Sequence, residues 1–488
     1  MALARSFKTD ESFLEQIAIG ATGARRAIDD LKNQSHQPIE LERGSTSYKI
    51  WKAIKIKRIR VPDVLCLRCG RRVESRAKTK MELSMSHSLS DPQRGWDFGL
   101  YDNEYIAFVH CVRTGLGPLD WLANDAVQYV LVEHMRQAWA ANQVKTERPK
   151  GAQEGFEIRV TWPAALASAP GVVERVDAGS IQYRRSDDNR RLSVRLNRQG
   201  TSLTPLVHLG DSVFASQILA SVVPVSRDCV CPSGADVQTY VALASSVSLS
   251  DRYTAVKALG YFDDEAAQTT LVTRTTDPKE HIYVRVDAAA GLMRRGNAVG
   301  RQFLTATLRD EYLANRLESA IVLGEVATPE AAQLLIATVE DQEQDPEIRA
   351  GAAGSLGELG AKEALPTLVR CFDSLQTIVK VEAARALAKL ARLHLSDVVQ
   401  ALPAGSPEQR PGIAWALSKA GQFTLDQMLP VMVDDDSRQW VTYIIGTQQR
   451  EALLPGIAQL ADQDPEVYFA VTMLWKIFDS WVYGLEEY

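Results

Sequence analysis

The chain has 488 residues, a length that predicts about two to four domains rather than a single core. Its residues are 45% hydrophobic and 24% charged, which excludes a disordered or fibrous protein. No apolar run approaches the ~18 residues of a membrane-spanning helix, and the N-terminus lacks the apolar core of a secretory signal. We therefore expect a cytoplasmic protein without a membrane partner, whose six cysteines are reduced thiols or metal ligands.

Positive charge is concentrated in residues 49–80. This segment contains twelve Lys and Arg residues against two acids, a local charge of +10 in a chain whose net charge is −6, so the remainder carries −16. Basic and apolar residues alternate, as in strands with one buried face. The concentration predicts a surface that binds a polyanion, and an ordinary solvated surface is the alternative. The candidate nucleic-acid contacts are Lys55, Lys57, Arg58, Arg60, Arg71 and Arg72.

The hydrophobic pattern changes several times along the chain. Apolar residues within 1–45 have helical spacing, whereas 46–112 is typical of strands and tight turns, with short strands expected near 63–67 and 71–80. Residues 118–143 predict one long amphipathic helix. A polar linker at 144–155 separates it from a region rich in β-branched residues. The domains predicted from these changes are 1–145, 156–226 and 235–488.

An all-helical repeat is predicted from about residue 235 to the end. A small residue next to Leu or Ile recurs at intervals of 33, 31, 33, 31, 30, 28 and 29 residues, which is the period of a helix pair. Small residues allow neighbouring helices to approach closely, and the repeated leucines should form one continuous core. The pattern resembles HEAT-like repeats, which implies a helical solenoid but says almost nothing about its ligand, so an arm that holds DNA or a protein partner is a separate hypothesis. The repeated positions are Leu259, Leu292, Leu323, Leu356, Leu387, Leu417, Ile445 and Leu474.

Asp63 and Glu74 have the residue type and spacing of a hydrolytic metal site. Two short strands should flank a Cys-x-x-Cys-Gly turn, with Asp63 at the start of the first strand and Glu74 within the second. Alternate residues of a strand share a face, so Arg76 and Lys78 should lie beside Glu74. Two carboxylates beside cationic groups suit a Mg²⁺ ion that activates water for phosphodiester hydrolysis. An ordinary strand start and a surface ion pair are the alternative.

This segment resembles the core of the PD-(D/E)xK nuclease superfamily, and within it the Dpn-type methyladenine-directed restriction endonucleases. In those enzymes a Cys-x-x-Cys-Gly knuckle also separates the catalytic Asp from the Glu-x-Lys strand. The resemblance implies Mg²⁺ ligands at Asp63 and Glu74. The superfamily lysine falls on Arg76, which cannot give up a proton and grips phosphate with two donors. Lys78, on the same face, is the candidate substitute.

Cys66 and Cys69 have the spacing of a zinc knuckle, but a structural zinc ion needs four ligands. No cysteine lies upstream, where the Dpn-type enzymes place a second pair. We expect Cys229 and Cys231 to complete one shared Zn²⁺ site. A partial site using His110 or Cys111, and free thiols, are the alternatives.

The middle segment contains two β motifs, Gly171–Ala178 and a Gly-Asp-x-Val-x-x-x-Gln-x-Leu-Ala element at 210–220. They resemble the barrel-sandwich hybrid fold of biotinyl and lipoyl carriers and, more closely, the hybrid barrel of the RNA polymerase β subunit. No modification lysine occurs, so the resemblance implies a fold and no activity.

The predicted fold is therefore multidomain α+β: a PD-(D/E)xK-like α/β core, a β barrel-sandwich hybrid and an all-α HEAT-like solenoid. The first functional hypothesis is a Mg²⁺-dependent DNA endonuclease, a hydrolase set in a defence or restriction system by analogy with other nuclease cores joined to repeats. The alternative is a catalytically inactive nucleic-acid-binding adaptor, in which Arg76 marks lost chemistry and the repeats recruit a protein. A transcription-associated factor is a third hypothesis.

Overall fold

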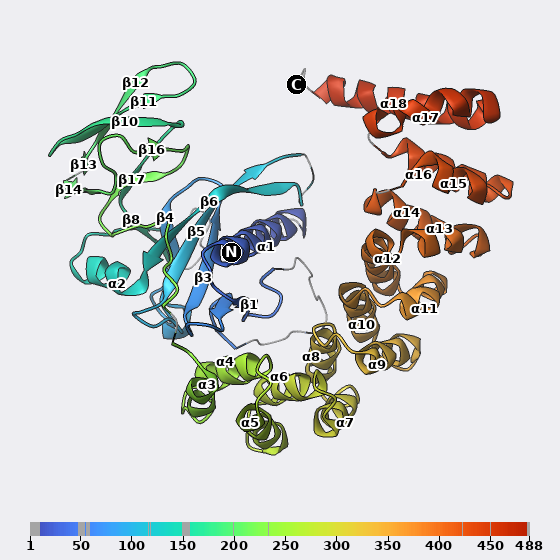
Figure 1. Cartoon of the computed structure of the whole chain (residues 1–488), viewed down its shortest axis with the longest axis horizontal. Helices are drawn as coiled ribbons and strands as arrows, with labels where there is room; N and C mark the ends of the chain where they lie inside the picture. Colours follow the sequence, from blue (N-terminus) through green and yellow to red (C-terminus); the bar gives the residue numbers. More distant parts are fainter. Residues whose placement is uncertain are drawn as a thin grey trace, which may run out of the picture. The chain divides into compact units, whose positions relative to one another are not determined.

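The computed structural model describes residues 10–46, 54, 59–115, 117, 119–148, 157–198, 200–232, 234–421, 423–448 and 450–485. The chain forms two compact units, which are drawn together in Figure 1. The first comprises Met1–Ile50 and Arg58–Ala266, and the second comprises Trp51–Lys57 and Ala267–Tyr488. The first unit is rich in strands and the second is helical, so the fold is multidomain and mixed, as predicted. The three domain boundaries stay a prediction.

A five-stranded mixed sheet and one helix form the centre of the first unit. Helix α1 packs against strands β3, β5 and β6 of a sheet with the order β1-β2-β3-β5-β6 (Figure 1). Strands β3 and β5 are parallel, and the other neighbours are antiparallel. The bounds are α1 Asp10–Asn33, β1 Pro38–Glu40, β2 Val64–Cys66, β3 Arg72–Lys78, β5 Tyr105–Arg113 and β6 Trp121–Leu131. The two strands expected near 63–67 and 71–80 are thus confirmed, with shorter bounds.

The long helix predicted at 118–143 is wrong for its first half. Residues Trp121–Leu131 form strand β6, and only Val132–Ala140 are helical, as α2. Four consecutive residues of β6, 127–130, are all buried, which fits a strand covered on both faces and not an amphipathic helix with one buried stripe. Pairing with β5, in which Tyr105 lies opposite Leu131, outweighs the local helix propensity.

The remaining strands of the first unit form smaller antiparallel sheets, with the orders β4-β8-β7, β15-β17-β9, β12-β11-β10-β16 and β13-β14. This region is rich in strands, as predicted, while the barrel-sandwich hybrid topology stays a prediction. Helices α3 and α4 end the unit. The bounds are β4 Leu83–Ser88, β7 Lys145–Glu147, β8 Glu157–Trp162, β9 Ala164–Leu166, β10 Gly171–Val176, β11 Ser180–Arg185, β12 Arg191–Arg195, β13 Asn197–Arg198, β14 Thr201–Ser202, β15 Thr204–Pro205, β16 Ser212–Val213, β17 Ile218–Ser221, α3 Val237–Leu243 and α4 Leu249–Leu259.

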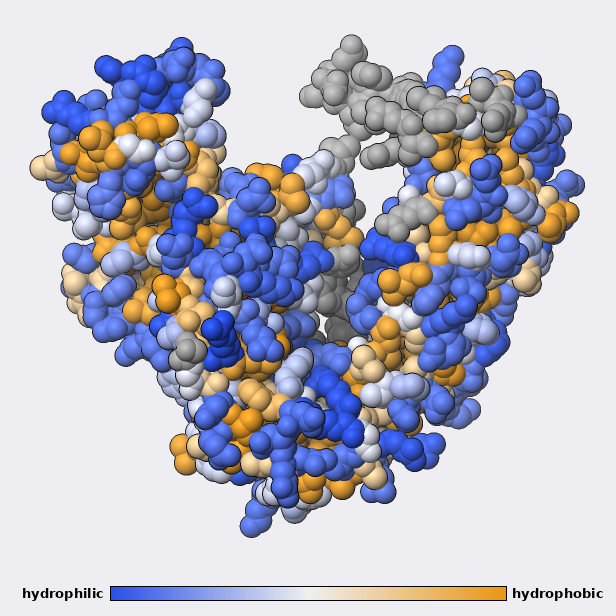
Figure 2. All heavy atoms as spheres, in the orientation of Figure 1, coloured by the Kyte–Doolittle hydropathy of each residue, from blue (hydrophilic) through white to orange (hydrophobic). Residues whose placement is uncertain are grey.

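The hairpin of β11 and β12 ends in a strongly hydrophilic tip (Figure 2). Its arginines are largely paired with acids: Arg184 and Arg191 both contact the Glu174 carboxylate, and Arg185 contacts Asp187. Mixed charge of this kind is typical of a solvated hairpin.

The second unit is a helical solenoid of successive helix pairs (Figure 1). The six leucines predicted to form the ladder are each 0% exposed, which confirms the repeat. Leu259 lies in α4 at the end of the first unit, and the other five, from Leu292 to Leu417, lie in the second. Gly357 in α10 shows why small residues recur, because a Cβ there would lie 2.5 Å from the Cα of Ala386 in α12. The bounds are α5 Glu265–Thr276, α6 Ile282–Met293, α7 Ala298–Thr307, α8 Leu313–Leu323, α9 Pro329–Glu340, α10 Pro346–Leu359, α11 Leu365–Arg370, α12 Thr377–Leu393, α13 Leu395–Ala404, α14 Arg410–Ala420, α15 Leu425–Met428, α16 Asp435–Gly446, α17 Arg450–Gln463 and α18 Pro465–Leu485.

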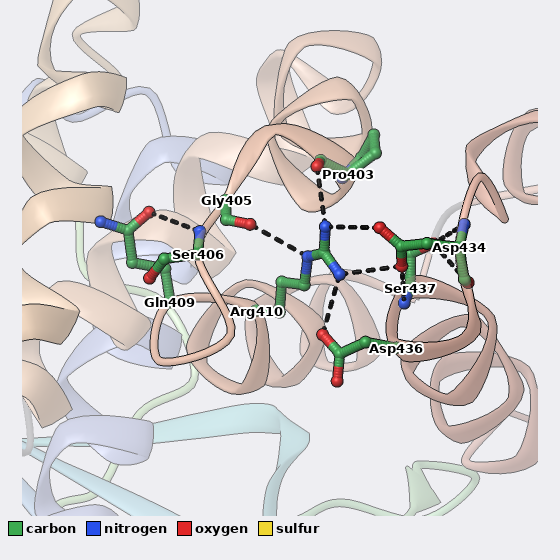
Figure 3. Close-up of polar contacts among 8 residues, drawn as sticks. All are labelled: Pro403, Gly405, Ser406, Gln409, Arg410, Asp434, Asp436 and Ser437. Carbon is green, nitrogen blue, oxygen red and sulfur yellow. Dashed lines mark hydrogen bonds and ion pairs between the residues drawn. The ribbon is translucent and has the colours of Figure 1, made fainter.

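An arginine seven residues before the repeated leucine fastens one helix of a pair to the other. In Figure 3 the Arg410 guanidinium donates hydrogen bonds to the carbonyl oxygens of Pro403 and Gly405, which close the preceding helix. It also lies 2.9 Å from the carboxylates of Asp434 and Asp436 in the following repeat. The Nε atoms of the equivalent Arg285 and Arg349 donate in the same way to carbonyls of the preceding helix. In the described part of the chain, no helix combines the length and apolar character that crossing a membrane requires.

Candidate active site and candidate metal centre

The predicted acid pair lies on neighbouring strands of the central sheet. Asp63 immediately precedes β2, and Glu74 is the third residue of β3. The Asp63 side chain is buried, with the residue 8% exposed, and its Oδ2 accepts a hydrogen bond of 2.7 Å from the backbone N–H of Ser75. Asp63 is therefore held in place by the strand that carries Glu74.

Like charges crowd the Asp63 carboxyl. Burial raises the pKa of Asp63 well above its ordinary value, and the nearby Glu74 and Glu42 carboxylates raise it further. Arg76 and the Ser75 N–H oppose this shift of the pKa without cancelling it. Burial and crowding of carboxylates both disfavour the ionised form, so a positive group is needed here.

Arg76 supplies that positive charge. Its Nη2 lies 2.6 Å from Oε1 of Glu74. Burial alone would lower the pKa of the Arg76 guanidinium, but Glu74, Asp63 and Glu42 together raise it. A guanidinium thus occupies the negative field in which the nuclease hypothesis places Mg²⁺.

Lys78, the candidate substitute for the superfamily lysine, is engaged elsewhere. Its ammonium donates hydrogen bonds to the backbone oxygen and the Oγ of Ser84 on β4, at 2.5 and 3.2 Å. Burial lowers the Lys78 pKa to about 8, and the charges of Arg76 and Arg159 contribute. Within the described residues, Asp63 and Glu74 do not belong to any group of three or more ligand side chains close enough to share a metal ion. Mg²⁺ binding by this pair stays a prediction.

The predicted nucleic-acid contacts have different environments. Arg72 is 3% exposed and pairs with the buried Glu104, and it donates a 2.9 Å hydrogen bond to Oγ of Ser250. Arg72 neutralises a buried carboxylate inside the first unit, so its predicted contact with nucleic acid is not supported. Arg71 is half-buried and donates to the Val230 oxygen at 2.9 Å. Arg60 is exposed, whereas Lys55, Lys57 and Arg58 lie outside the described residues.

Four side chains that can bind a soft metal converge beside the sheet. His36 Nδ1 and the Sγ atoms of Cys66, Cys69 and Cys231 all lie within 4.8 Å of one another. Cys66 Sγ is 3.9 Å from Cys231 Sγ, and Cys69 Sγ is 3.7 Å from His36 Nδ1. A hydrogen bond from the Cys69 thiol lowers the pKa of Cys66 to about 4, and the Gln37 N–H contributes. The cluster is the only group of this kind in the described part of the chain.

The predicted ligand Cys229 does not join this cluster. Its side chain is fully buried in the apolar core beside Val64 and Tyr129, and burial raises its thiol pKa to about 12. Its backbone oxygen instead accepts a 2.7 Å hydrogen bond from His36 Nε2. The structure therefore places His36, and not Cys229, beside Cys66, Cys69 and Cys231, and zinc binding stays a prediction. His110 and Cys111, the partial-site alternative, are also outside the cluster.

A third candidate site lies on the solenoid. Asp287, Glu318 and Glu382 stand five residues before the repeated leucine in α6, α8 and α12, and all three are buried. In α10 that position is Gly351, and the buried acid Glu347 lies one turn earlier on the same face. Successive helices of this set contact each other, so the acids form a line across them.

Ile54, far upstream in the sequence, contacts the line of acids at Glu347. Ile54, which belongs to the second compact unit, is 5% exposed and is part of the solenoid's apolar core. Its backbone N–H donates a 2.6 Å hydrogen bond to Oε2 of Glu347. The acidic face of the solenoid therefore holds an apolar residue by its side chain and its backbone.

The comparisons identify the repeats. Residues 302–388 match the family model for HEAT repeats. No curated protein matches the chain. Solved structures with similar helices include the CpcE–CpcF complex of phycocyanin lyase from Nostoc, which is 20% identical, covers 50% of this chain and 96% of that chain, and has a TM-score of 0.26.

Two further structures are similar in the same way. Human deoxyhypusine hydroxylase is 16% identical over 44% of this chain and 96% of that chain, with a TM-score of 0.20. A karyopherin bound to the extreme C-terminus of the protein phosphatase Cdc14p is 12% identical over 49% of this chain and 33% of that chain, with a TM-score of 0.28. These scores carry no argument about function.

Proposed function

We propose that the protein is a HEAT-repeat scaffold that binds an extended, basic and apolar segment of a protein partner along the acidic line of α6, α8, α10 and α12. The observation that carries this proposal is the placement of Ile54. Its side chain packs among the helices and its backbone N–H donates to Glu347, so the site accepts an apolar residue from a segment that is distant in the sequence.

Charge complementarity supports the same chemistry. The sequence around Ile54, residues 49–60, contains six Lys and Arg residues, no acid, four isoleucines and one tryptophan. The site contributes four buried carboxylates, those of Asp287, Glu318, Glu347 and Glu382. Four carboxylates along one line set up a negative field, which favours a basic ligand over a neutral or acidic one.

The test is binding of a fluorescent peptide with the sequence of residues 49–60 to the full-length chain. Ile54→Asp should weaken the contact in cis and expose the site, so this variant should bind the added peptide at least about tenfold more tightly than wild type. Glu347→Gln in the Ile54→Asp background should reverse that gain. Glu343→Gln, at an exposed turn between α9 and α10, is the matched control and should leave the affinity unchanged.

Two outcomes would contradict the scaffold proposal. In one, Ile54→Asp binds the peptide no better than wild type while its helical content is unchanged. In the other, a peptide with the basic residues retained and the isoleucines replaced by serine binds equally well, which would mean that charge alone attracts it. Raising the salt concentration should weaken binding only in part, because apolar burial also contributes.

A Mg²⁺-dependent endonuclease is the second candidate function. It is favoured by the position of Asp63 before β2 and Glu74 on β3, by the parallel pairing of β3 with β5, and by the mutual crowding that raises the Asp63 pKa. Arg76, paired with Glu74, argues against it. The scaffold proposal therefore expects no metal-dependent cleavage.

The deciding assay incubates wild type and Arg76→Lys with assorted DNAs and either Mg²⁺ or Mn²⁺. Cleavage by wild type that Asp63→Ala abolishes would establish the endonuclease. Cleavage that is found only in Arg76→Lys would show a nuclease-like site that the arginine blocks. Absence of cleavage in both proteins agrees with a scaffold whose N-terminal unit has no hydrolytic role.

A further inference from the structure

We propose that His36, Cys66, Cys69 and Cys231 bind one structural Zn²⁺ through Nδ1 and three thiolates, a site that fastens three separate segments of the first unit. The inference is independent of peptide binding by the solenoid. It rests on the convergence of the four donor atoms within 4.8 Å.

The distances fit a tetrahedral ion. Zinc–sulfur bonds of about 2.3 Å and zinc–nitrogen bonds of about 2.05 Å place two sulfurs about 3.8 Å apart and a sulfur about 3.6 Å from a nitrogen. Cys66 Sγ and Cys231 Sγ are 3.9 Å apart, and Cys69 Sγ is 3.7 Å from His36 Nδ1. These two distances therefore match a tetrahedral site, and the other donor pairs, all within 4.8 Å, need to close by about 1 Å at most.

The hydrogen bond of His36 presents the correct nitrogen. The Cys229 carbonyl can only accept, so the 2.7 Å contact places a hydrogen on Nε2. In the neutral imidazole Nδ1 then keeps its lone pair, which is directed at the thiols. A carbonyl that accepts from the second ring nitrogen is the usual support for a metal-bound histidine.

The backbone around the thiols is also arranged for binding. Gly70 has φ +72°, the left-handed conformation that glycine adopts readily, and its N–H donates to the Cys66 oxygen at 2.9 Å. This closes the Cys-x-x-Cys turn and turns both sulfurs to one side. The Gln37 N–H lies 3.4 Å from Cys66 Sγ, and such a donor stabilises a thiolate.

The ligand set selects zinc and a structural role. Three thiolates and one imidazole suit Zn²⁺, whereas Mg²⁺ and Ca²⁺ require oxygen ligands. Four protein ligands leave no open position for water or substrate, as in structural sites. The ion would join the end of α1, the turn between β2 and β3, and the segment after β17. Because Asp63 immediately precedes β2 and Glu74 lies on β3, the site would also brace the acid pair.

The experiment measures the zinc content of the full-length chain, purified without added metal, by inductively coupled plasma mass spectrometry. Wild type and Cys229→Ser should each hold about one Zn per chain, while Cys66→Ser, Cys69→Ser and Cys231→Ser should retain less than about a tenth of that. His36→Asn should also lose most of it. Cys371→Ser, at a buried cysteine in the solenoid, is the matched control and should retain the metal.

Cobalt substitution keeps the proposal testable if a variant folds poorly. The Co²⁺ form of wild type should show tetrahedral visible bands and thiolate charge-transfer absorption, and Cys229→Ser should preserve the spectrum. Loss of zinc in Cys229→Ser with retention in His36→Asn would overturn the ligand set in favour of four cysteines. A wild-type chain that stays free of zinc after refolding with the ion, or that contains a Cys66–Cys231 disulfide by intact mass, would overturn the site itself.

Discussion

The guanidinium Nη2 of Arg76 lies 2.6 Å from the Oε1 of Glu74, two residues earlier on the same strand. Residues two apart share a face of the sheet, so the ion pair is a direct consequence of the Glu-Ser-Arg sequence. The pair differs from an isolated surface contact because the Arg76 charge also acts on the buried Asp63 carboxyl, whose pKa burial and Glu74 raise.

Asp63→Asn should stabilise the protein increasingly as the pH rises. A folded-state pKa above the ordinary value means that the Asp63 carboxyl contributes stability below its unfolded pKa of about 3.9, and that this contribution is lost as the pH rises through the folded-state pKa. Each unit of that difference is worth about 1.4 kcal/mol. The free energy of unfolding of the variant and of wild type should therefore diverge in the variant's favour above about pH 4, until the pH passes the folded-state pKa of Asp63.

Asp29→Asn, which removes an exposed carboxylate of α1, controls for the change in net charge. A constant difference between Asp63→Asn and wild type over the pH range would contradict the prediction. Stabilisation of wild type by Mg²⁺ that is absent in Asp63→Asn would show that the carboxylate binds a metal instead.

Leu356→Ala should cost about 2–5 kcal/mol, because it leaves a cavity in the continuous core of the solenoid. Leu356 is 0% exposed and Leu375, in the same unit, is 97% exposed, so Leu375→Ala is the matched control. Denaturant unfolding monitored by far-UV circular dichroism would measure both. Equal effects of the two substitutions would refute the buried ladder.

Arg72→Gln should destabilise the first unit by about 3–5 kcal/mol, because it leaves the buried Glu104 carboxylate without its cationic partner. Arg71→Gln, at the adjacent half-buried arginine, should cost less than about 1 kcal/mol. The measurement is urea unfolding monitored by tryptophan fluorescence. If Arg72→Gln is as stable as wild type yet loses affinity for DNA, the arginine binds nucleic acid after all.

Gly357→Ala should destabilise the solenoid by about 1–3 kcal/mol, because the added Cβ would lie 2.5 Å from the Ala386 backbone. Gly20→Ala is the matched control in α1, where an added Cβ meets nothing within 4 Å. That substitution should stabilise by about 0.4–1 kcal/mol, since it reduces the freedom of the unfolded chain. Thermal unfolding of both variants would reveal the opposite signs, and shifts of the same sign would contradict the close packing of α10 and α12.

Local and periodic features could be predicted from the sequence. The solenoid follows from a small-residue and leucine pattern that repeats with the helix-pair period, and every copy reports the same packing. The turn from Cys66 to Gly70 depends on neighbours in the chain, so its position between two strands was also predictable.

Features that depend on distant partners could not be predicted in this way. His36 lies near Cys69 because the chain after α1 passes beside the sheet. The spacing of the two residues along the sequence does not predict this contact. The helix expected over residues 121–131 is a strand because β5 pairs with it. Arg72 has the same local charge pattern as its exposed neighbours, and only the position of Glu104 distinguishes it.

Ile54 and Glu347 are separated by 293 residues, and this separation has a consequence for synthesis. A ribosome that adds about 5–20 residues per second needs about 15 to 60 s to make α10 after Ile54 has been translated. During that interval Ile54 lies in a basic stretch of sequence, and the α10 residue that its backbone N–H contacts does not yet exist. Chaperone contact with residues 49–60 should therefore be greatest before translation of α10 is complete.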